Sequence, residues 1–302
     1  MATENETIGG YPLRRLLFTG PFSQVWEVVE PRSHRHFAMK ILLPERAEDP
    51  EHRQMLFHEA EVGIKMKHDN VIPIVKVSRD KTAPFIIMEF FPAGSLRKRI
   101  MSKDPTDKLF LIDHAKEIFK QVATGLAYMN SNGWVHCDIK PDNVLADSAG
   151  RVKIIDFAIS KRVEKGFLAK LFHKRKKPSG TASYMSPEQI RDDILDGRAD
   201  IYSFGAMLYE LTTGRVPFRA ATPKELLEKQ LVAKVDPPTT YNPDITEEFS
   251  KFVVKMLEKK REDRYQNFHE VMIALKDIRP YKVTIKDRPI STEPPPKRGP
   301  NG

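Results

Sequence analysis

The chain has 302 residues, 40% of them hydrophobic and 30% charged, which suits a globular protein with one large core or two lobes. No run approaches the ~20 apolar residues of a membrane span, and residues 1–6 have neither a basic leader nor an apolar core, so membrane insertion and secretion are not expected. The single cysteine, Cys137, excludes an intramolecular disulfide and a cysteine-rich zinc site. It fits a reducing compartment, and a cytoplasmic location is predicted.

The formal net charge of +9 would suit nucleic acid, an acidic substrate or a membrane surface. No zinc-finger, RNP or basic-zipper pattern accompanies this charge, so no nucleic-acid partner is expected. Charge alone therefore does not identify a function.

The first half of the chain predicts a small antiparallel sheet. Residues 11–29 alternate and are rich in β formers, and after the turn-like residues 30–34 a second apolar stretch, 36–43, continues the meander. Gly20 and Pro21 mark a turn inside the first stretch.

Lys40 lies inside the apolar stretch 36–43, where an unpaired ammonium group is costly to bury. This predicts a carboxylate or a ligand phosphate as its partner. A helix is expected from Pro50 to about residue 67, and Glu59 lies on its apolar stripe. In the alternative interpretation, Lys40 reaches solvent at a strand edge and Glu59 is merely solvated.

The second half predicts a mainly helical unit. An apolar run at 85–91 is broken by residues 92–95, which we interpret as a hinge. Apolar residues recur at helical spacing over 112–129, and 198–211 is apolar around most of a helical circumference, which predicts a buried helix. From residue 286 the chain is rich in proline and charge and is not expected to pack.

The most informative stretch is His-Cys-Asp-Ile-Lys-Pro-Asp-Asn, residues 136–143, followed by Asp156. Asp138 can orient a hydroxyl, Lys140 is a cation for a migrating charge, and Asn143 with Asp156 offers oxygen ligands for magnesium. Each residue taken singly also suits a turn, since Asp, Asn and Pro favour turns for local backbone reasons. Their combination in this order points to phosphoryl transfer.

In this order the residues resemble the catalytic loop and the metal-binding Asp-Phe-Gly of the eukaryotic-like serine/threonine protein kinases. Cys137 stands in place of the usual arginine and Ala158 in place of the glycine. The resemblance covers roughly residues 11–280. It implies an α+β, bilobal fold, in which a small antiparallel β-sheet lobe with one helix is joined to a larger, mainly helical lobe. The implied domain limits are a flexible N-terminus at 1–10, the small lobe at 11–91, the large lobe at 92–280 and a proline-rich charged tail at 281–302.

The resemblance also implies ATP and magnesium as ligands and assigns roles to single residues. Lys40 would hold the α- and β-phosphates, oriented by Glu59, and Met88 would gate the back of the adenine pocket. The implied catalytic residues are Asp138, Lys140, Lys40 and Glu59; the implied metal ligands are Asn143 and Asp156. The implied nucleotide-binding residues are Gly20, Val25, Ala38, Lys40, Met88, Leu145 and the backbones of Glu89 and Phe91.

Further motifs bear on the acceptor. Asp-Ile-Lys-Pro at 138–141 and the segment 180–185 resemble the serine/threonine subclass, so a serine or threonine of a protein substrate is the expected acceptor. Ser186-Pro187-Glu188 corresponds to the family's Ala-Pro-Glu, with Arg264 as the buried partner of the glutamate. A small-molecule kinase of related fold is a second enzymatic reading, which these motifs disfavour.

Four departures from the family pattern favour a different reading, a pseudokinase scaffold. Phe18 and Ser23 occupy two of the three glycine positions of the phosphate-covering loop, where a side chain restricts the approach of backbone amides to phosphates. Cys137 lacks the charge and the fork with which arginine clasps a phosphate in the activation segment, and Ala158 restricts the backbone after Asp156. The complete set of acidic, amide and lysine residues argues against a scaffold and for an ATP- and magnesium-dependent serine/threonine protein kinase.

The activation region 161–177 carries apolar residues at helical spacing beside the basic cluster Lys174-Arg175-Lys176-Lys177. It would suit docking to an acidic substrate, a membrane surface or a partner helix. A solvated charged loop is the alternative, since short charge runs usually are solvated.

Overall fold

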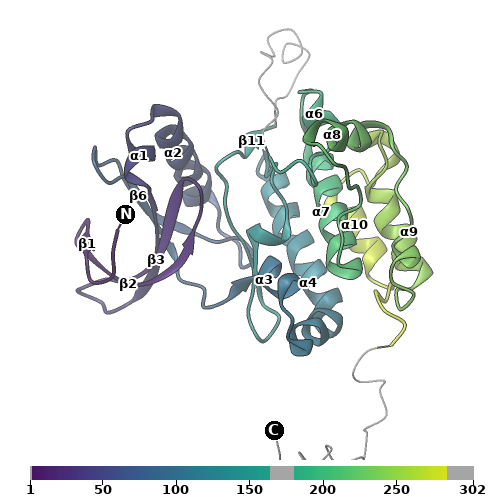
Figure 1. Cartoon of the computed structure of the whole chain (residues 1–302), viewed down its shortest axis with the longest axis horizontal. Coiled ribbons are helices and arrows are strands. Elements are labelled where there is room, and N and C mark those ends of the chain that lie inside the picture. Colours follow the sequence, from purple (N-terminus) through teal and green to yellow (C-terminus); the bar gives the residue numbers. More distant parts are fainter. Residues whose placement is uncertain (1, 164–179, 284–302) are drawn as a thin grey trace, which may run out of the picture.

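The computed structural model describes residues 2–163 and 180–283, which form two lobes (Figure 1). The small lobe is built around an antiparallel sheet and the large lobe around helices, as the family resemblance implies. The chain passes between them after Glu89, the last residue of a strand, and the predicted hinge at 92–95 lies at this crossing.

The sheet of the small lobe has six strands in the order β1-β2-β3-β4-β6-β5. The predicted meander is confirmed, since β2, β3 and β4 pair antiparallel with their sequence neighbours. The chain joins the sheet before the predicted boundary at residue 11, because β1 pairs with the start of β2. The strands are β1 Thr7–Ile8, β2 Tyr11–Thr19, β3 Ser23–Val29, β4 His36–Leu42, β5 Ile74–Ser78 and β6 Phe85–Glu89.

Two helices accompany this sheet, α1 Pro44–Ala47 and α2 Pro50–Lys65. The predicted start of α2 is confirmed: the side chain of Asp49 accepts a hydrogen bond from the backbone N–H of Glu51, which satisfies an otherwise free donor of the first turn. Gly63 lets α2 approach β5 closely, because a Cβ at this position would lie 2.4 Å from Cδ1 of Ile74.

The large lobe contains the predicted buried helix as α7, in which every residue from Ala199 to Thr212 is buried. The predicted helix over 112–129 is the central part of α4. The helices are α3 Leu96–Met101, α4 Pro105–Ser131, α6 Pro187–Ile190, α7 Gly197–Thr213, α8 Pro223–Val232, α9 Glu247–Met256 and α10 Phe268–Leu275.

Short strands line the inner edge of the large lobe and carry the motifs singled out in the sequence. β7, β9 and β10 form one small antiparallel sheet, and β8 pairs with β11 in another. The strands are β7 Gly94–Ser95, β8 Trp134–Val135, β9 Val144–Ala146, β10 Val152–Ile154 and β11 Lys161–Arg162, and a 3₁₀ turn, Pro141–Asn143, precedes β9.

One hydrophobic core runs from the small lobe into the large one, and it includes Ala38 and Met88 on the sheet and Ile154 on β10. A second, smaller cluster covers the other face of the sheet. Tyr281, at the start of the predicted tail, is also buried and pairs with Ile245, so the packed part of the chain extends past residue 280.

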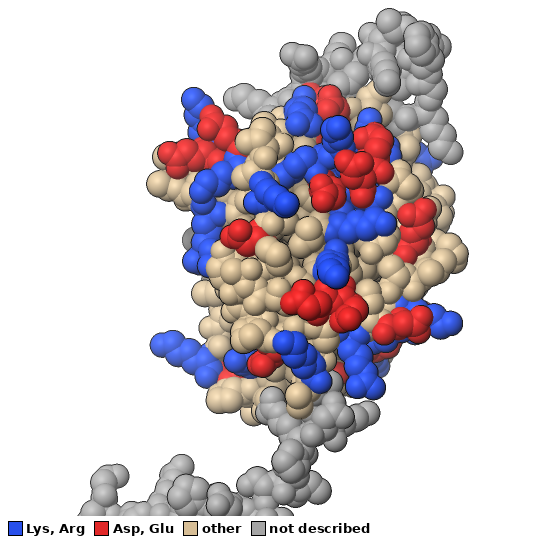
Figure 2. All heavy atoms as spheres, turned by 90° about the vertical axis from the view of Figure 1, so that its right-hand side faces the viewer, with Lys and Arg blue, Asp and Glu red and all other residues tan. Residues whose placement is uncertain are grey.

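Over residues 2–163 and 180–283, no helix is both long and apolar enough to cross a membrane. Figure 2 shows the end of the large lobe, where Lys and Arg are interspersed with Asp and Glu, so this face has no large patch of one sign. Much of the excess positive charge lies elsewhere in the sequence, since residues 164–179 carry six Lys or Arg and one Glu.

Candidate active site

Lys40 is positioned by the register of the small-lobe sheet. It lies opposite Val25 of β3 and Ile86 of β6, so these side chains share one face. Its Nζ lies 2.6 Å from Oε2 of Glu59 on α2 and 3.4 Å from Oδ1 of Asp156, which follows β10. The predicted pairing of Lys40 with a carboxylate is therefore present, and it includes a second carboxylate from the large lobe.

Burial and charge oppose each other in this group. Burial disfavours the ammonium of Lys40, but the negative charges of Asp156 and Glu59 outweigh it and raise the pKa of Lys40. Burial raises the pKa of Glu59 to about 7, although Lys40 opposes this shift. Burial would also raise the pKa of Asp156, but the positive charge of Lys40, together with His136, Lys140 and the N–H of Ala158, outweighs it and holds this pKa below its ordinary value.

Asp138 is held at both carboxylate oxygens. Oδ2 accepts from Nζ of Lys140 at 2.6 Å and from Nδ2 of Asn143 at 3.0 Å. Oδ1 accepts from the backbone N–H and the hydroxyl of Thr181, at 3.1 and 3.0 Å. Nζ of Lys140 also lies 2.7 Å from Oγ1 of Thr181, so one carboxylate, one ammonium and one hydroxyl meet at a single point.

The backbone of the catalytic loop is held by Asp200, a fully buried carboxylate of α7. It accepts the N–H groups of His136 and Cys137 at 2.9 and 3.0 Å, and Nδ2 of Asn130 at 3.0 Å. Cys137 has a positive φ of 69°, a conformation that side chains rarely adopt, and these bonds hold it there. Burial raises the pKa of the Cys137 thiol, so this residue is a neutral part of the loop.

Asn143 and Asp156 are brought together by pairing of the segments that carry them. The N–H of Ile155 donates to the carbonyl oxygen of Asn143 at 3.0 Å. Nδ2 of Asn143 donates to the carbonyl oxygen and Oδ2 of Asp138, at 2.8 and 3.0 Å, which leaves its Oδ1 available as a ligand. Asp156 has a φ of 69°, in the left-handed region that residues other than glycine rarely adopt.

This donor set fits magnesium. Within the described part of the chain, no three His, Cys, Asp or Glu side chains gather into a metal site. Magnesium commonly binds one or two protein oxygens and takes its other ligands from phosphates and water, so one carboxylate with one amide oxygen is a sufficient set.

The residues expected at the adenine pocket gather around the crossing between the lobes. Ala38 pairs directly with Met88, and Val25 packs against the same core. Leu145, on β9, comes from the large lobe. The N–H of Glu89 donates to the carbonyl oxygen of Pro73 at 3.1 Å, so its own carbonyl is the group that it can offer to a base.

Two further residues that are expected to bind the nucleotide lie near this crossing or at the β2–β3 hairpin. Phe91 packs, partly buried, against the core just after β6. Gly20 closes the β2–β3 turn by donating its N–H to the carbonyl oxygen of Ser23 at 2.9 Å. A Cβ on Gly20 would lie 3.0 Å from the ring of Phe18, a close approach that the exposed ring would have to relieve by a small shift.

Four residues that contact the candidate site were not predicted from the sequence as site residues. Besides Thr181, they are Gln189, which donates to the carbonyl oxygen of Cys137 at 2.8 Å, and Lys153, which pairs with Glu89 at 2.9 Å. Arg97 of α3 joins Glu210, Tyr184 and Asp142 in one network beside the catalytic loop. Only Thr181 gave a usable signal, since it lies in the segment interpreted as receiving the acceptor.

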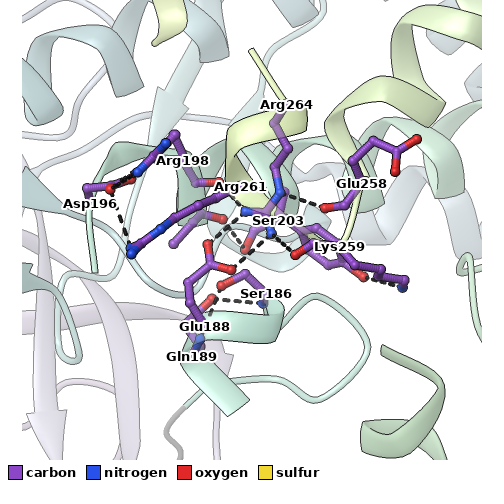
Figure 3. A network of polar contacts seen from close by, with 12 residues as sticks. Ser186, Glu188, Gln189, Asp196, Arg198, Ser203, Glu258, Lys259, Arg261 and Arg264 are labelled. Carbon is purple, nitrogen blue, oxygen red and sulfur yellow. Dashed lines mark hydrogen bonds and ion pairs between the residues drawn. The ribbon is translucent and has the colours of Figure 1, made fainter. Parts of the chain in front are cut away.

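The predicted partnership of Glu188 and Arg264 is confirmed, and Figure 3 shows it at the centre of a polar network. Two guanidinium nitrogens of Arg264 donate to the two carboxylate oxygens of Glu188 at 2.7 and 2.9 Å. The carbonyl oxygens of Glu258, Arg198 and Lys259 accept the remaining bonds of Arg264. Ser186 begins α6 with a capping box, which fixes the orientation of Glu188.

Comparisons with known proteins agree with this geometry. A family model described as the protein kinase domain matches residues 11–274. A probable serine/threonine-protein kinase of Clostridium acetobutylicum is 32% identical over 269 residues, which cover 89% of this chain and 40% of that protein. A probable serine/threonine-protein kinase of Streptomyces coelicolor is 30% identical over 277 residues, covering 90% of this chain and 40% of that protein.

The serine/threonine-protein kinase PknB of Mycobacterium tuberculosis is 29% identical over 280 residues, which cover 91% of this chain and 44% of PknB. The chain thus spans about two fifths of the length of the curated relatives it matches. The basic cluster 174–177, considered above for docking, lies outside the described residues.

Proposed function

Because this chain belongs to the protein kinase family, we propose that it is an ATP- and magnesium-dependent serine/threonine protein kinase. It transfers the γ-phosphoryl group of ATP to a serine or threonine hydroxyl of a protein. The observation that carries this proposal is the junction at Lys40, whose ammonium contacts Glu59 of one lobe and Asp156 of the other. A pair that reaches across the lobes supports an assembled phosphate-binding site.

The proposed chemistry uses the residues of the catalytic loop. Asp138 orients the acceptor hydroxyl and takes its proton as the oxygen forms a bond to the γ-phosphorus and the bond to the leaving ADP oxygen breaks. Lys140, 2.6 Å from Asp138, is placed to neutralise charge on the γ-phosphoryl oxygens. Lys40 holds the α- and β-phosphates in the same way, and Glu59 keeps its ammonium oriented.

The metal ligands are Asn143 and Asp156. Bound magnesium would neutralise phosphate charge and help align the transferred group. Asn143 also donates a hydrogen bond to Asp138. This bond fixes the proposed metal ligand, Asn143, relative to the residue that receives the proton, Asp138.

Thr181 supports a serine or threonine acceptor. Its hydroxyl lies 3.0 Å from Asp138 and 2.7 Å from Lys140, so a polar group of the 180–185 segment already occupies the surroundings of the transfer site. We propose that an acceptor hydroxyl binds beside Thr181 and shares these two partners.

One substitution and one contact support activity that does not depend on phosphorylation of the activation segment. Cys137 provides no cation for a phosphate, while Gln189 of α6 already ties the segment to the carbonyl oxygen of Cys137. We propose that this neutral hydrogen bond replaces the charge-dependent clasp. The proposed location is the cytoplasm, and residues 161–177 are proposed to dock an acidic substrate, a membrane surface or a partner helix.

The function is tested with labelled ATP, magnesium and a generic basic protein. We expect phosphoserine or phosphothreonine in the wild-type reaction and loss of nearly all incorporation with Asp138→Ala and with Lys40→Met. Thermal unfolding of each variant serves as the folding control. A wild-type protein that binds nucleotide but incorporates no label would instead support the pseudokinase reading.

A further inference from the structure

His58, which neither the catalytic nor the nucleotide-binding set includes, contacts the segment that carries the metal ligand. Its Nε2 lies 2.7 Å from the carbonyl oxygen of Ser160, 102 residues further along the chain. A carbonyl oxygen can only accept, so Nε2 of His58 carries the proton and donates. The ring is held from one side by Trp134, whose ring centroid lies 5.8 Å away in an edge arrangement.

Ser160 closes the turn that follows Asp156. Its N–H donates to the carbonyl oxygen of Phe157 at 3.1 Å, and its hydroxyl lies 3.3 Å from the carbonyl oxygen of His136. The residue is only 3% exposed, so its carbonyl oxygen has little access to water if His58 is removed. A buried acceptor without a donor is unfavourable, which gives the turn a reason to stay with α2.

The neighbouring residue on α2 reaches the start of the same segment through Lys40. Glu59 accepts a hydrogen bond from the ammonium of Lys40 at 2.6 Å, and this ammonium also lies 3.4 Å from Oδ1 of Asp156. Successive residues of an α-helix project about 100° apart, so His58 and Glu59 reach two separate points of the segment. α2 therefore contacts the segment from Asp156 to Ser160 near its start, through Glu59 and Lys40, and at its end, through His58.

We infer that His58 is a positioning residue, which couples the placement of α2 to the placement of the metal ligand Asp156 through Ser160. This inference rests on the proposed function, because it assigns His58 to the magnesium-dependent part of nucleotide binding. It does not make His58 a contact of the nucleotide or of the metal. Movement of α2 would break the bond from His58 to Ser160 and the bond from Lys40 to Glu59 together.

The experiment measures how much magnesium strengthens ADP binding, by calorimetry of the full chain with and without the metal. In His58→Leu we expect this strengthening to fall by roughly tenfold, the usual size of an effect from a residue behind a metal ligand. Metal-free ADP affinity should stay unchanged, because it depends on the sheet and the crossing between the lobes. His58→Gln, whose side-chain amide can still donate, should recover most of the loss.

Gln54→Leu is the matched control, because Gln54 is an exposed polar residue of the same helix. It should keep the wild-type response to magnesium. If His58→Leu does not fold, His58→Asn, whose amide is too short to reach Ser160, takes its place in the same measurement.

The inference is overturned if the His58 variant without a donor responds to magnesium as the wild type does, or if His58→Gln is as impaired as His58→Leu. A different result would contradict the proposed function itself, namely that magnesium does not change the ADP affinity of the wild-type protein. The two failures are therefore distinguishable in one set of titrations.

Discussion

Two ion pairs of this molecule, Arg264 with Glu188 and Lys40 with Glu59, are built for different tasks. Arg264 is completely buried and uses its planar fork on both oxygens of Glu188, with three carbonyl oxygens accepting its other bonds. Lys40 is 17% exposed and lies between two carboxylates, of which Asp156 is 37% exposed and more distant. The Arg264–Glu188 pair has its hydrogen bonds satisfied within the protein. The ammonium of Lys40, in contrast, keeps one N–H that can donate and is accessible to a phosphate.

The difference also follows the chemistry of the two cations. Arginine offers five donors in a fixed geometry, which suits a permanent bidentate contact. Lysine is a compact charge on a flexible stem, and it can exchange one oxygen partner for another at little geometric cost. We therefore expect substitutions at Lys40 to affect turnover most and substitutions at Arg264 to affect folding most.

The largest expected effect is on turnover. Lys40→Met should lower kcat/KM on the order of a thousandfold, because charge stabilisation of the phosphates is lost at a buried site. Its free energy of unfolding should fall by only about 1 to 2 kcal/mol, because Glu59, with a pKa of about 7, can take up a proton when its partner is removed. Steady-state kinetics and urea unfolding measure the two effects, and a loss of stability that accounts for the whole loss of activity would contradict the comparison.

Breaking the other pair should mainly unfold the protein. Arg264→Met leaves Glu188 buried without a cation, and we expect the free energy of unfolding to fall by about 3 to 5 kcal/mol. The double variant Arg264→Met with Glu188→Leu removes the stranded charge and should recover part of the loss. Urea unfolding of the wild type, the single variant and the double variant tests this expectation. No recovery in the double variant would show that the stability is lost mainly at the carbonyl oxygens that Arg264 binds, and not at Glu188.

A third cation, Lys259, extends the comparison to the pH dependence of stability. Burial, with the nearby charge of Arg264, lowers the pKa of Lys259 to about 8 from its ordinary value of 10.5. Between these values the unfolded chain binds the proton more strongly, so stability contributed by this group rises with pH across that window and is constant below it. Relative to Lys259→Met, the wild type should gain about 1 kcal/mol between pH 7.5 and 9.5, given its partial exposure. Equal pH dependence of the two proteins would contradict the shift.

The smallest expected effect concerns the activation segment. Because Cys137 is neutral and buried and Gln189 already holds its carbonyl oxygen, removal of phosphate from the protein should leave turnover unchanged. The measurement is turnover before and after phosphatase treatment, with mass spectrometry to confirm that phosphate has been removed. A large loss of activity would show that a charge-dependent clasp exists elsewhere.

Much of the site was accessible from the sequence because the essential residues lie close together along the chain. Asp138, Lys140 and Asn143 fall within one loop, and Asp156 follows one short hairpin later. The pairing of Lys40 with Glu59 was also predictable, since a lysine within an apolar strand needs a nearby anion. The helix that carries Glu59 was predictable from a capping residue and a first-turn proline.

Other contacts could not be predicted, because they join segments far apart in the sequence. The bond between His58 and Ser160 spans 102 residues, and the bonds between Asp138 and Thr181 span 43. His58 belongs to no recognisable motif. Thr181 lies in the segment interpreted as receiving the acceptor, but nothing in the sequence joins it to Asp138. The sequence also placed the tail from residue 281, whereas Tyr281 is buried against the large lobe.

The sequence by itself determined which chemical groups are available and which segments become strands and helices, because turn chemistry, caps and hydrophobic periodicity act over a few neighbouring residues. Only the tertiary structure decided that His58 of α2 contacts the turn after Asp156, that Thr181 lies beside Asp138, and that the hydrogen bonds of Arg264 are all satisfied while those of Lys40 are not. Burial and hydrogen-bond satisfaction are properties of packed surroundings, and distant parts of the chain supply those surroundings.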